Sequence, residues 1–149
     1  MKILNELKMV VESRSLNESF ARVAVAAFVA QLDPTVEEVT DVKTAVSEAV
    51  TNCIVHAYGD TLGKIYITVQ IMEHHVVKIS IRDKGKGIEN IEKAMEPLYT
   101  TGGGERAGLG FAVMQSFCDR ISVRSKLGKG TTVNLFKSIS YKVSANGSA

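Results

Sequence analysis

Three polar side chains recur every fourth residue between residues 47 and 56. On a helix, Glu48, Asn52 and His56 form one row, with neighbouring Cβ atoms about 5–6 Å apart. A carboxylate, a carboxamide and an imidazole in such a row can hold a metal ion together with a water or a hydroxyl. The row fits a solvated helix face equally well, so its meaning depends on what the rest of the chain places opposite it.

The composition predicts a single globular domain over residues 1–149. The chain has 149 residues, 45% hydrophobic content and a formal net charge of +2, which suits one well-packed core. That charge gives no reason to expect nucleic acid or an acidic membrane surface as a partner. Cys53 and Cys118 lie in apolar helical patterns, and the chain shows no secretory signal and no apolar run long enough to span a membrane. We therefore expect a cytoplasmic protein with reduced thiols.

The N-terminal part predicts a strand and a helix. Residues 6–13 alternate as a strand, and Ser15 and Glu18 have the spacing of a capping box for a helix that ends at Leu32. Arg22 is the only charged side chain in the middle of this helix. A helix so apolar is covered on more than one side. It is either a central core helix or a helix that also meets another chain.

A second helix carries the polar row. Thr35 and Glu38 form another capping box, and an apolar stripe at helical spacing runs on as far as residue 57. The stripe lies opposite Glu48, Asn52 and His56. The row therefore faces away from the core contact of its own helix, toward either a ligand or water.

Two alternating segments, residues 64–72 and 77–81, predict a hairpin with one buried face. If the alternation continues, Asp83 points into that face. A buried carboxylate is unfavourable unless it has a donor to bind. The donor is either a backbone amide of the next turn or an exocyclic amine of a ligand. His74 and His75, in the connection, are expected to be exposed turn residues.

Glycines dominate the segment after that hairpin. Gly85 and Gly87 let the backbone turn sharply and approach a planar ligand, and a short helix over residues 89–96 follows. Residues 98–107 are rich in threonine and glycine and predict a loose loop. The run from Gly108 to Phe111 then opens a helix whose free N–H groups suit phosphate.

The end of the chain predicts a final hairpin and a frayed tail. Residues 121–125 and 131–136 alternate as two strands around a Gly-Lys-Gly turn. From residue 140 the sequence is polar and rich in small residues, which is typical of a flexible end.

The order of these motifs resembles the ATP-binding fold shared by gyrase B, the ninety-kilodalton heat-shock proteins, sensor histidine kinases and MutL. The order is helical Glu-x3-Asn-x3-His, strand Asp-x-Gly-x-Gly, a Thr/Gly loop leading to Gly-x-Gly, and Gly-Thr-Thr. Longer stretches narrow the resemblance to the small serine kinases that act as sporulation anti-sigma F factors. These stretches are Asn-Glu-Ser-Phe-Ala-Arg-Val from Asn17, Phe-Val-Ala-Gln-Leu-Asp-Pro-Thr from Phe28, Val-Ser-Glu-Ala-Val-Thr-Asn from Val46 and Pro-Leu-Tyr-Thr-Thr from Pro97.

The resemblance implies an α+β fold of the Bergerat type and a role for each candidate residue. The fold is a two-layer α/β sandwich, with a mixed, mostly antiparallel sheet covered on one face by helices. Asn52 would coordinate Mg²⁺, Glu48 would accept the proton of an incoming serine hydroxyl, and Asp83 would accept from the adenine amine of ATP or ADP. The remaining implied contacts are His56, Gly85, Gly87, Thr100, Thr101, Gly108, Leu109, Gly110, Phe111 and Thr131, with Arg106 reaching the terminal phosphate.

The resemblance also implies protein partners. Such kinases are homodimers that bind the sigma F subunit of RNA polymerase and phosphorylate a serine of an anti-anti-sigma protein, without binding nucleic acid or membranes directly. Arg22 would face a protein partner. Gly102, Gly103 and Gly104 stand where the family usually carries Lys-Pro-Glu-Leu, so we expect a lid that orders weakly around the phosphates.

Three alternatives stay open. Instead of a sporulation serine kinase, the chain could be a nucleotide-gated anti-sigma module with little kinase activity. It could also be a general-stress anti-sigma kinase, or the ATP-binding half of a sensor histidine kinase. The last alternative requires a helical hairpin with a phosphoacceptor histidine, and no segment of this chain fits one.

Overall fold

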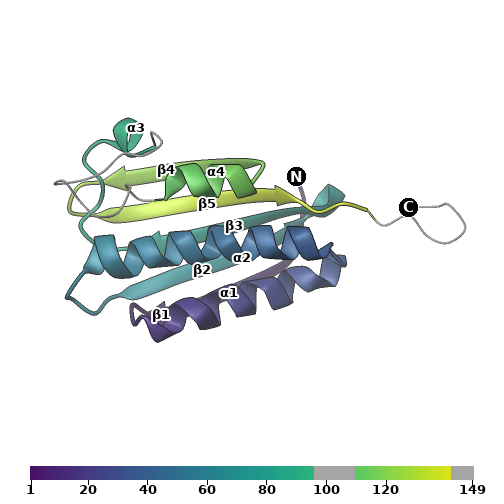
Figure 1. Ribbon diagram of the computed structural model, residues 1–149, viewed down its shortest axis with the longest axis horizontal. Coiled ribbons are helices and arrows are strands. Elements are labelled where there is room, and N and C mark those ends of the chain that lie inside the picture. Colours follow the sequence, from purple (N-terminus) through teal and green to yellow (C-terminus); the bar gives the residue numbers. More distant parts are fainter. Residues whose placement is uncertain (96–109, 142–149) are drawn as a thin grey trace, which may run out of the picture.

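The computed structural model describes residues 1–95 and 110–141, which form a five-stranded sheet with helices on one face (Figure 1). The strand order is β1-β2-β3-β5-β4, and every described ladder is antiparallel, where the sequence predicts a mixed sheet. The two-layer α+β fold is confirmed. The strands are β1 (Ile3–Glu12), β2 (Lys64–Met72), β3 (Val76–Asp83), β4 (Arg120–Lys126) and β5 (Gly130–Ser138).

The helical layer is built from α1 (Leu16–Val29), α2 (Val36–Thr51), the short α3 (Ile91–Ala94) and α4 (Phe111–Phe117). Three short turns complete the described elements, at Ala30–Leu32, Asn52–Tyr58 and Glu73–His75. The predicted helix over residues 89–96 is thus shorter in the structure, and residue 96 lies outside the described part of the chain. None of the described helices is long and apolar enough to cross a membrane.

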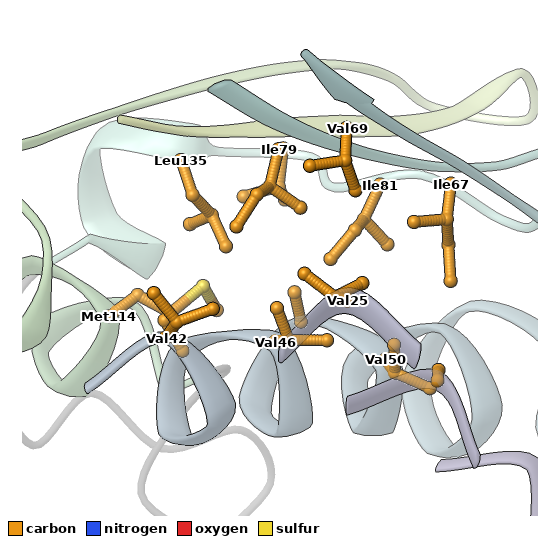
Figure 2. Close-up of a cluster of buried hydrophobic side chains, with 14 of the residues drawn as sticks. Val25, Val42, Val46, Val50, Ile67, Val69, Ile79, Ile81, Met114 and Leu135 are labelled. Carbon is orange, nitrogen blue, oxygen red and sulfur yellow. The ribbon is translucent and has the colours of Figure 1, made fainter. Parts of the chain in front are cut away.

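The core lies between the sheet and α2. Alternate residues of each central strand point inward, and valines from α1 and α2 meet them (Figure 2). Burying each such side chain stabilises the fold by about 1.5–3 kcal/mol. The labelled members of this cluster are Val25, Val42, Val46, Val50, Ile67, Val69, Ile79, Ile81, Met114 and Leu135.

Helix α1 is buried on one face only. Ala21, Val25 and Val29 are fully buried, whereas the side chains of Phe20 and Val23 are 56% and 51% exposed. The alternative of a central core helix is therefore wrong for the single chain. Its apolar outer face leaves the second interpretation, contact with another chain, as a prediction.

The two predicted capping boxes have different outcomes. Thr35 Oγ1 accepts from the Glu38 N–H and Glu38 Oε1 accepts from the Thr35 N–H, so that box is confirmed. The Ser15 box is wrong, because Ser15 already has helical backbone angles and its side chain makes no capping bond. Glu18 instead accepts from Arg22 Nε at 2.9 Å and Ser47 Oγ at 2.6 Å, which joins α1 to α2.

The start of the predicted frayed tail is anchored. The Ser140 N–H and hydroxyl both donate to Glu38, and the Tyr141 ring stacks on His75 with their centroids 3.9 Å apart. His74 is exposed as predicted, but His75 is half-buried under this contact, so its prediction is wrong. Residues 142–149 lie outside the described part of the chain.

A partly buried ion pair ties β5 to α2 and α4. Lys137 Nζ donates to Asp41 Oδ2 at 2.9 Å and to the Phe117 carbonyl at 3.1 Å, and the Lys137 and Asp41 side chains are only 14% and 18% exposed. Leaving a fully buried charge without its partner costs about 3–5 kcal/mol. Because this site is partly open to water, we expect Lys137→Met to lower the free energy of unfolding by about 2 kcal/mol, measured by urea denaturation.

The control is Lys8→Met, which removes an exposed pair with Glu6 at 3.8 Å and should change stability by less than about 0.5 kcal/mol. Replacing both members of the buried pair, as Asp41→Leu with Lys137→Met, should recover most of the loss. If Lys137→Met and Lys8→Met lowered the free energy of unfolding by the same amount, the structural role of the Lys137–Asp41 pair would be contradicted.

Candidate functional site

A cavity of about 600 Å³ opens beside the C-terminal end of α2. This is within the range of about 300–1,000 Å³ of small-molecule sites. Its wall comes from α2 and the turn after it, the ends of β3 and β5, α3, and the start of α4. The lining residues are Ala49, Asn52, Cys53, His56, Ala57, Asp83, Lys86, Gly87, Ile88, Glu89, Asn90, Lys93, Ala94, Phe111, Leu127, Thr131 and Val133.

The predicted helical row ends in a wider turn than expected. Helix α2 stops at Thr51, and Asn52–Tyr58 is π-helical, so a regular α-helix through His56 is a wrong prediction. Asn52 and His56 still line the cavity. The Ala57 carbonyl accepts from the Lys86 N–H at 3.1 Å. The π turn thereby attaches the helix to the loop after β3, and such turns are frequent at functional sites.

Asp83 ends the buried face of β3, as the alternation predicts, and is 5% exposed. Its Oδ1 accepts from the Gly85 N–H at 2.9 Å and the Thr131 N–H at 3.2 Å. Its Oδ2 has the Cys53 thiol at 3.6 Å. Burial raises the pKa of this carboxyl, and the Gly85 N–H, the Cys53 thiol and the Thr131 N–H act in the opposite direction. The acceptor capacity left on Oδ2 suits an amine of a ligand.

Gly85 and Gly87 are required by the protein backbone itself. A Cβ at Gly85 would lie 2.4 Å from the Ala57 carbonyl oxygen, and one at Gly87 would lie 2.2 Å from the Lys126 carbonyl oxygen. Gly87 also has a φ of +76°, which glycine adopts most readily. Of the two, only Gly87 lines the cavity. The close approach at these glycines is to the protein's own backbone, and approach to a planar ligand stays a prediction.

Ser125 is a site residue that the sequence does not single out. Its Oγ accepts from the Ile88 N–H at 2.7 Å and lies 2.8 Å from Thr131 Oγ1. It therefore joins the cavity rim to the strand that carries Thr131. The alternation of β4 could have predicted this position, because Ser125 follows Ile121 and Val123 on the inward face of the strand. The same alternation along β3 predicts that Asp83 points inward.

Glu48 lies at the edge of the site and is not part of the cavity wall. A Cβ at Gly110, which has a φ of +68°, would lie 2.2 Å from Glu48 Oε2. The carboxylate therefore sits against the backbone where α4 begins. Phe111 follows and is 2% exposed, with its ring in the cavity wall. Asn52 and His56 line the cavity, whereas Glu48, one turn earlier in α2, is not among the lining residues.

Several residues predicted to contact the ligand or a partner are not found in the cavity wall. Thr100, Thr101, Arg106, Gly108 and Leu109 lie outside the described residues, as do the three glycines at 102–104. Arg22 lies on α1, where it pairs with Glu18 at 2.9 Å, and is not among the residues that line the cavity.

The donor set of the cavity fits magnesium held largely by phosphate and water. Asn52 is 9% exposed and lines the cavity, and a neutral carboxamide oxygen is a suitable ligand for a hard cation. In residues 1–95 and 110–141 there is no group of three or more His, Cys, Asp or Glu side chains that could hold a metal. A site built only from protein ligands is therefore not found in this part of the chain.

The sequence predicts Cys53 only as a core thiol, but in the structure the thiol also donates to Asp83 Oδ2. Burial raises its pKa well above the ordinary range of a thiol, so the S–H stays available as a donor to Asp83. We expect Cys53→Ala to weaken ATP binding about three- to tenfold, because a hydrogen bond to a charged group is removed. Isothermal titration calorimetry measures the change.

Cys53→Ser is the matched control, because its hydroxyl keeps the donor and should bind ATP within about twofold of the wild type. Identical losses for the alanine and serine variants would show that the thiol acts through its volume alone.

The comparisons with known proteins fit this geometry. Residues 12–137 match the family described as the histidine kinase-like ATPase domain. The anti-sigma F factor of Anoxybacillus flavithermus is 56% identical over 135 residues, which is 89% of this chain and 92% of the relative. The chain belongs to the anti-sigma F factor family. Another member of this family, from Caldanaerobacter subterraneus subsp. tengcongensis, is 55% identical over 140 residues, covering 93% of this chain and 97% of the relative.

Solved structures support the fold of this anti-sigma F factor family member. The crystal structure of the RsbU and RsbW domains of a Mycobacterium tuberculosis protein superposes with a TM-score of 0.66 at 18% identity, over 91% of this chain and 32% of that one. The catalytic domain of the histidine kinase ThkA gives a TM-score of 0.56 at 18% identity, over 91% and 97% of the two chains. At this identity the likeness shows the fold alone.

Proposed function

We propose that this chain is an ATP-dependent serine kinase that also inhibits a sigma factor of the sigma F type. The observation that carries the proposal is Asp83, a buried acceptor facing a cavity of about 600 Å³ in a histidine kinase-like ATPase domain. The names of the anti-sigma F relatives support the sigma partner. Within residues 1–95 and 110–141 one core cluster joins strands and helices from both ends of the chain, which supports one kinase domain over residues 1–149. We place this protein in the cytoplasm.

Several residues divide the proposed reaction among themselves, and of these Arg106, Gly108 and Leu109 lie outside the described part of the chain. Asp83 accepts from the adenine amine, and Asn52 would hold Mg²⁺. The ion, when bound, neutralises phosphate charge. Glu48 takes the proton of a serine hydroxyl of the anti-anti-sigma protein as its oxygen bonds to the γ-phosphorus and the bond to ADP breaks. Arg106 and the Gly108 to Phe111 run are proposed to bind the phosphates.

The outer face of α1 supports the proposed protein contacts. Leu16, Phe20 and Val23 are 85%, 56% and 51% exposed and recur at helical spacing, which suits a homodimer contact. Arg22 lies on the same helix with 36% of its side chain exposed. We assign it to the sigma factor or to the anti-anti-sigma protein, which would compete for the same surface.

Arg22→Ala should weaken binding of sigma F at least about tenfold, because guanidinium groups are common anchors of interfaces. ATP affinity should stay unchanged, since Arg22 is outside the cavity wall. Surface plasmon resonance with immobilised sigma F measures the first, and calorimetry the second. Arg14→Ala is the control, because Arg14 makes the same kind of contact, to Glu12 at 2.9 Å. Equal losses of sigma and ATP binding would overturn this division.

The choice of sigma factor is tested by competition. Purified sigma F and a general-stress sigma factor are offered together to the tagged chain with ATP and Mg²⁺. Preferential capture of sigma F supports the proposal. Preferential capture of the other sigma factor would make the chain a general-stress anti-sigma kinase. Equal capture with and without ATP would exclude the alternative of a nucleotide-gated anti-sigma module.

A further inference from the structure

The helices cover one face of the sheet (Figure 1). The strand positions that alternate with the buried ones, and so point to the other, open face, carry mostly cations. Two of the strand carboxylates, Glu6 and Glu12, point to this face and both lie on the edge strand β1, whereas Asp83 of β3 is buried on the helical side. The positive excess on this face is larger than the net +2 of the whole chain, so a nearly neutral composition conceals a segregation of charge. The cations on this face are Lys8, Lys64, Lys78, Arg82, Arg120, Arg124 and Lys126.

The strand register places four of these cations around a polar centre. Arg82 and Arg124 flank Thr132 in one row across β3, β5 and β4. Lys78 and Arg120 flank Phe136 in a second row, four residues further along. With strands about 4.8 Å apart and a rise of about 3.3 Å per residue, the four cations frame an area of about 10 by 13 Å.

The polar row inside this frame offers hydrogen-bonding groups. Ser80, Asn134 and Ser122 lie side by side across the same three strands. Asn134 donates from Nδ2 to Ser122 Oγ at 3.3 Å. Hydroxyl and carboxamide groups of this kind can bind both phosphate oxygens and base edges.

None of the four framing cations forms an ion pair in residues 1–95 and 110–141. Arg120 instead lies 3.9 Å from the centroid of the Phe136 ring, and Arg82 lies 5.3 Å from that of Tyr66. Asp119, a carboxylate just before β4, already accepts the Ser138 N–H at 2.5 Å. Clustered cations without carboxylates raise the local potential and favour an anionic partner.

We propose that the open face over β3, β5 and β4 binds single-stranded nucleic acid. The framing cations contact phosphates, and the Arg120 and Phe136 stack provides a platform for a base. Single-stranded nucleic acid is favoured over an acidic polypeptide because the face combines cations with stacked aromatic and guanidinium groups and small hydrogen-bonding side chains. The proposal is independent of the function assigned to the cavity.

The test uses the full chain and a fluorescein-labelled twelve-nucleotide oligouridylate, followed by fluorescence anisotropy with saturating ATP present. Uridine is chosen so that the proposed adenine site does not capture the probe. Four phosphate contacts predict that the logarithm of the affinity falls with the logarithm of salt at a slope of about −3. Absence of binding at low salt would overturn the proposal.

Variants locate the binding and identify the class of partner. Arg120→Gln with Arg124→Gln should weaken binding about tenfold or more and halve the salt slope, to about −1.5. Arg14→Gln with Lys43→Gln, which removes the same charge outside this face, should bind like the wild type. Phe136→Leu should weaken binding about fivefold, with its melting temperature checked in parallel.

Two results would overturn the assignment to nucleic acid. The first is equal weakening by the two double variants, which would mean that net charge alone drives association. The second is displacement of the probe by oligoglutamate as efficiently as by unlabelled oligouridylate, together with no effect of Phe136→Leu. That result would make the face a docking surface for acidic polypeptide.

Discussion

Asp83→Asn is expected to lower ATP affinity by at least about 100-fold while leaving the protein folded. The carboxamide oxygen can still accept from the Gly85 and Thr131 N–H groups, which Oδ1 does in the wild type. The new amide nitrogen, however, replaces Oδ2 and opposes a donor on the ligand as well as the Cys53 thiol. Calorimetric titration with ATP and Mg²⁺ measures the loss, and urea denaturation checks the fold.

Asp119→Asn is the matched control for this substitution. Asp119 also accepts a backbone N–H, from Ser138 at 2.5 Å, but is not among the residues that line the cavity. Its variant should bind ATP like the wild type. Because burial raises the pKa of Asp83, ATP binding should also weaken on acidification at a higher pH than an ordinary aspartate titrates. Retention of full affinity by Asp83→Asn would remove Asp83 from base recognition.

Glu48→Gln is expected to reduce phosphate transfer at least about 100-fold, the usual contribution of a general base. Glutamine keeps the shape of the side chain that packs against Gly110 but cannot accept a proton. Because Glu48 is not part of the cavity wall, ATP affinity should stay within about twofold of the wild type. Single-turnover transfer to the anti-anti-sigma protein is the measurement.

Glu37→Gln is the control, since Glu37 is an exposed carboxylate in the first turn of the same helix. It should transfer phosphate at the wild-type rate. A Glu48→Gln variant with unchanged transfer would mean that the serine proton goes to another group, and a loss of ATP binding in parallel would give Glu48 a binding role.

Strand alternation and capping-box spacing predict the features whose partners lie close together in the sequence. The alternation of apolar residues along β3 is enough to place Asp83 in the buried face. Thr35 and Glu38 form their capping box because all its partners lie within three residues. The same rule fails at Ser15, where the competing partner of Glu18 is Ser47, twenty-nine positions away. A tertiary contact therefore decides that helix start.

The features that sequence does not predict depend on contacts between distant elements. The π turn at Asn52–Tyr58 is coupled to the Ala57 to Lys86 bond, which exists only once β3 is in place. Likewise, the role of Cys53 depends on its approach to Asp83 in the folded chain. A net charge of +2 does not reveal the cationic sheet face, because strand register gathers residues from separate segments.

Phosphate transfer from γ-labelled ATP to a small sulphate-transporter-like anti-anti-sigma protein tests the proposed function most directly. The wild type should label a serine of that protein, and Asp83→Asn and Glu48→Gln should not. Absence of label from the wild type, with ATP-dependent capture of sigma F retained, would contradict the kinase assignment and leave a nucleotide-gated binding module. Label on a histidine would point instead to histidine kinase chemistry.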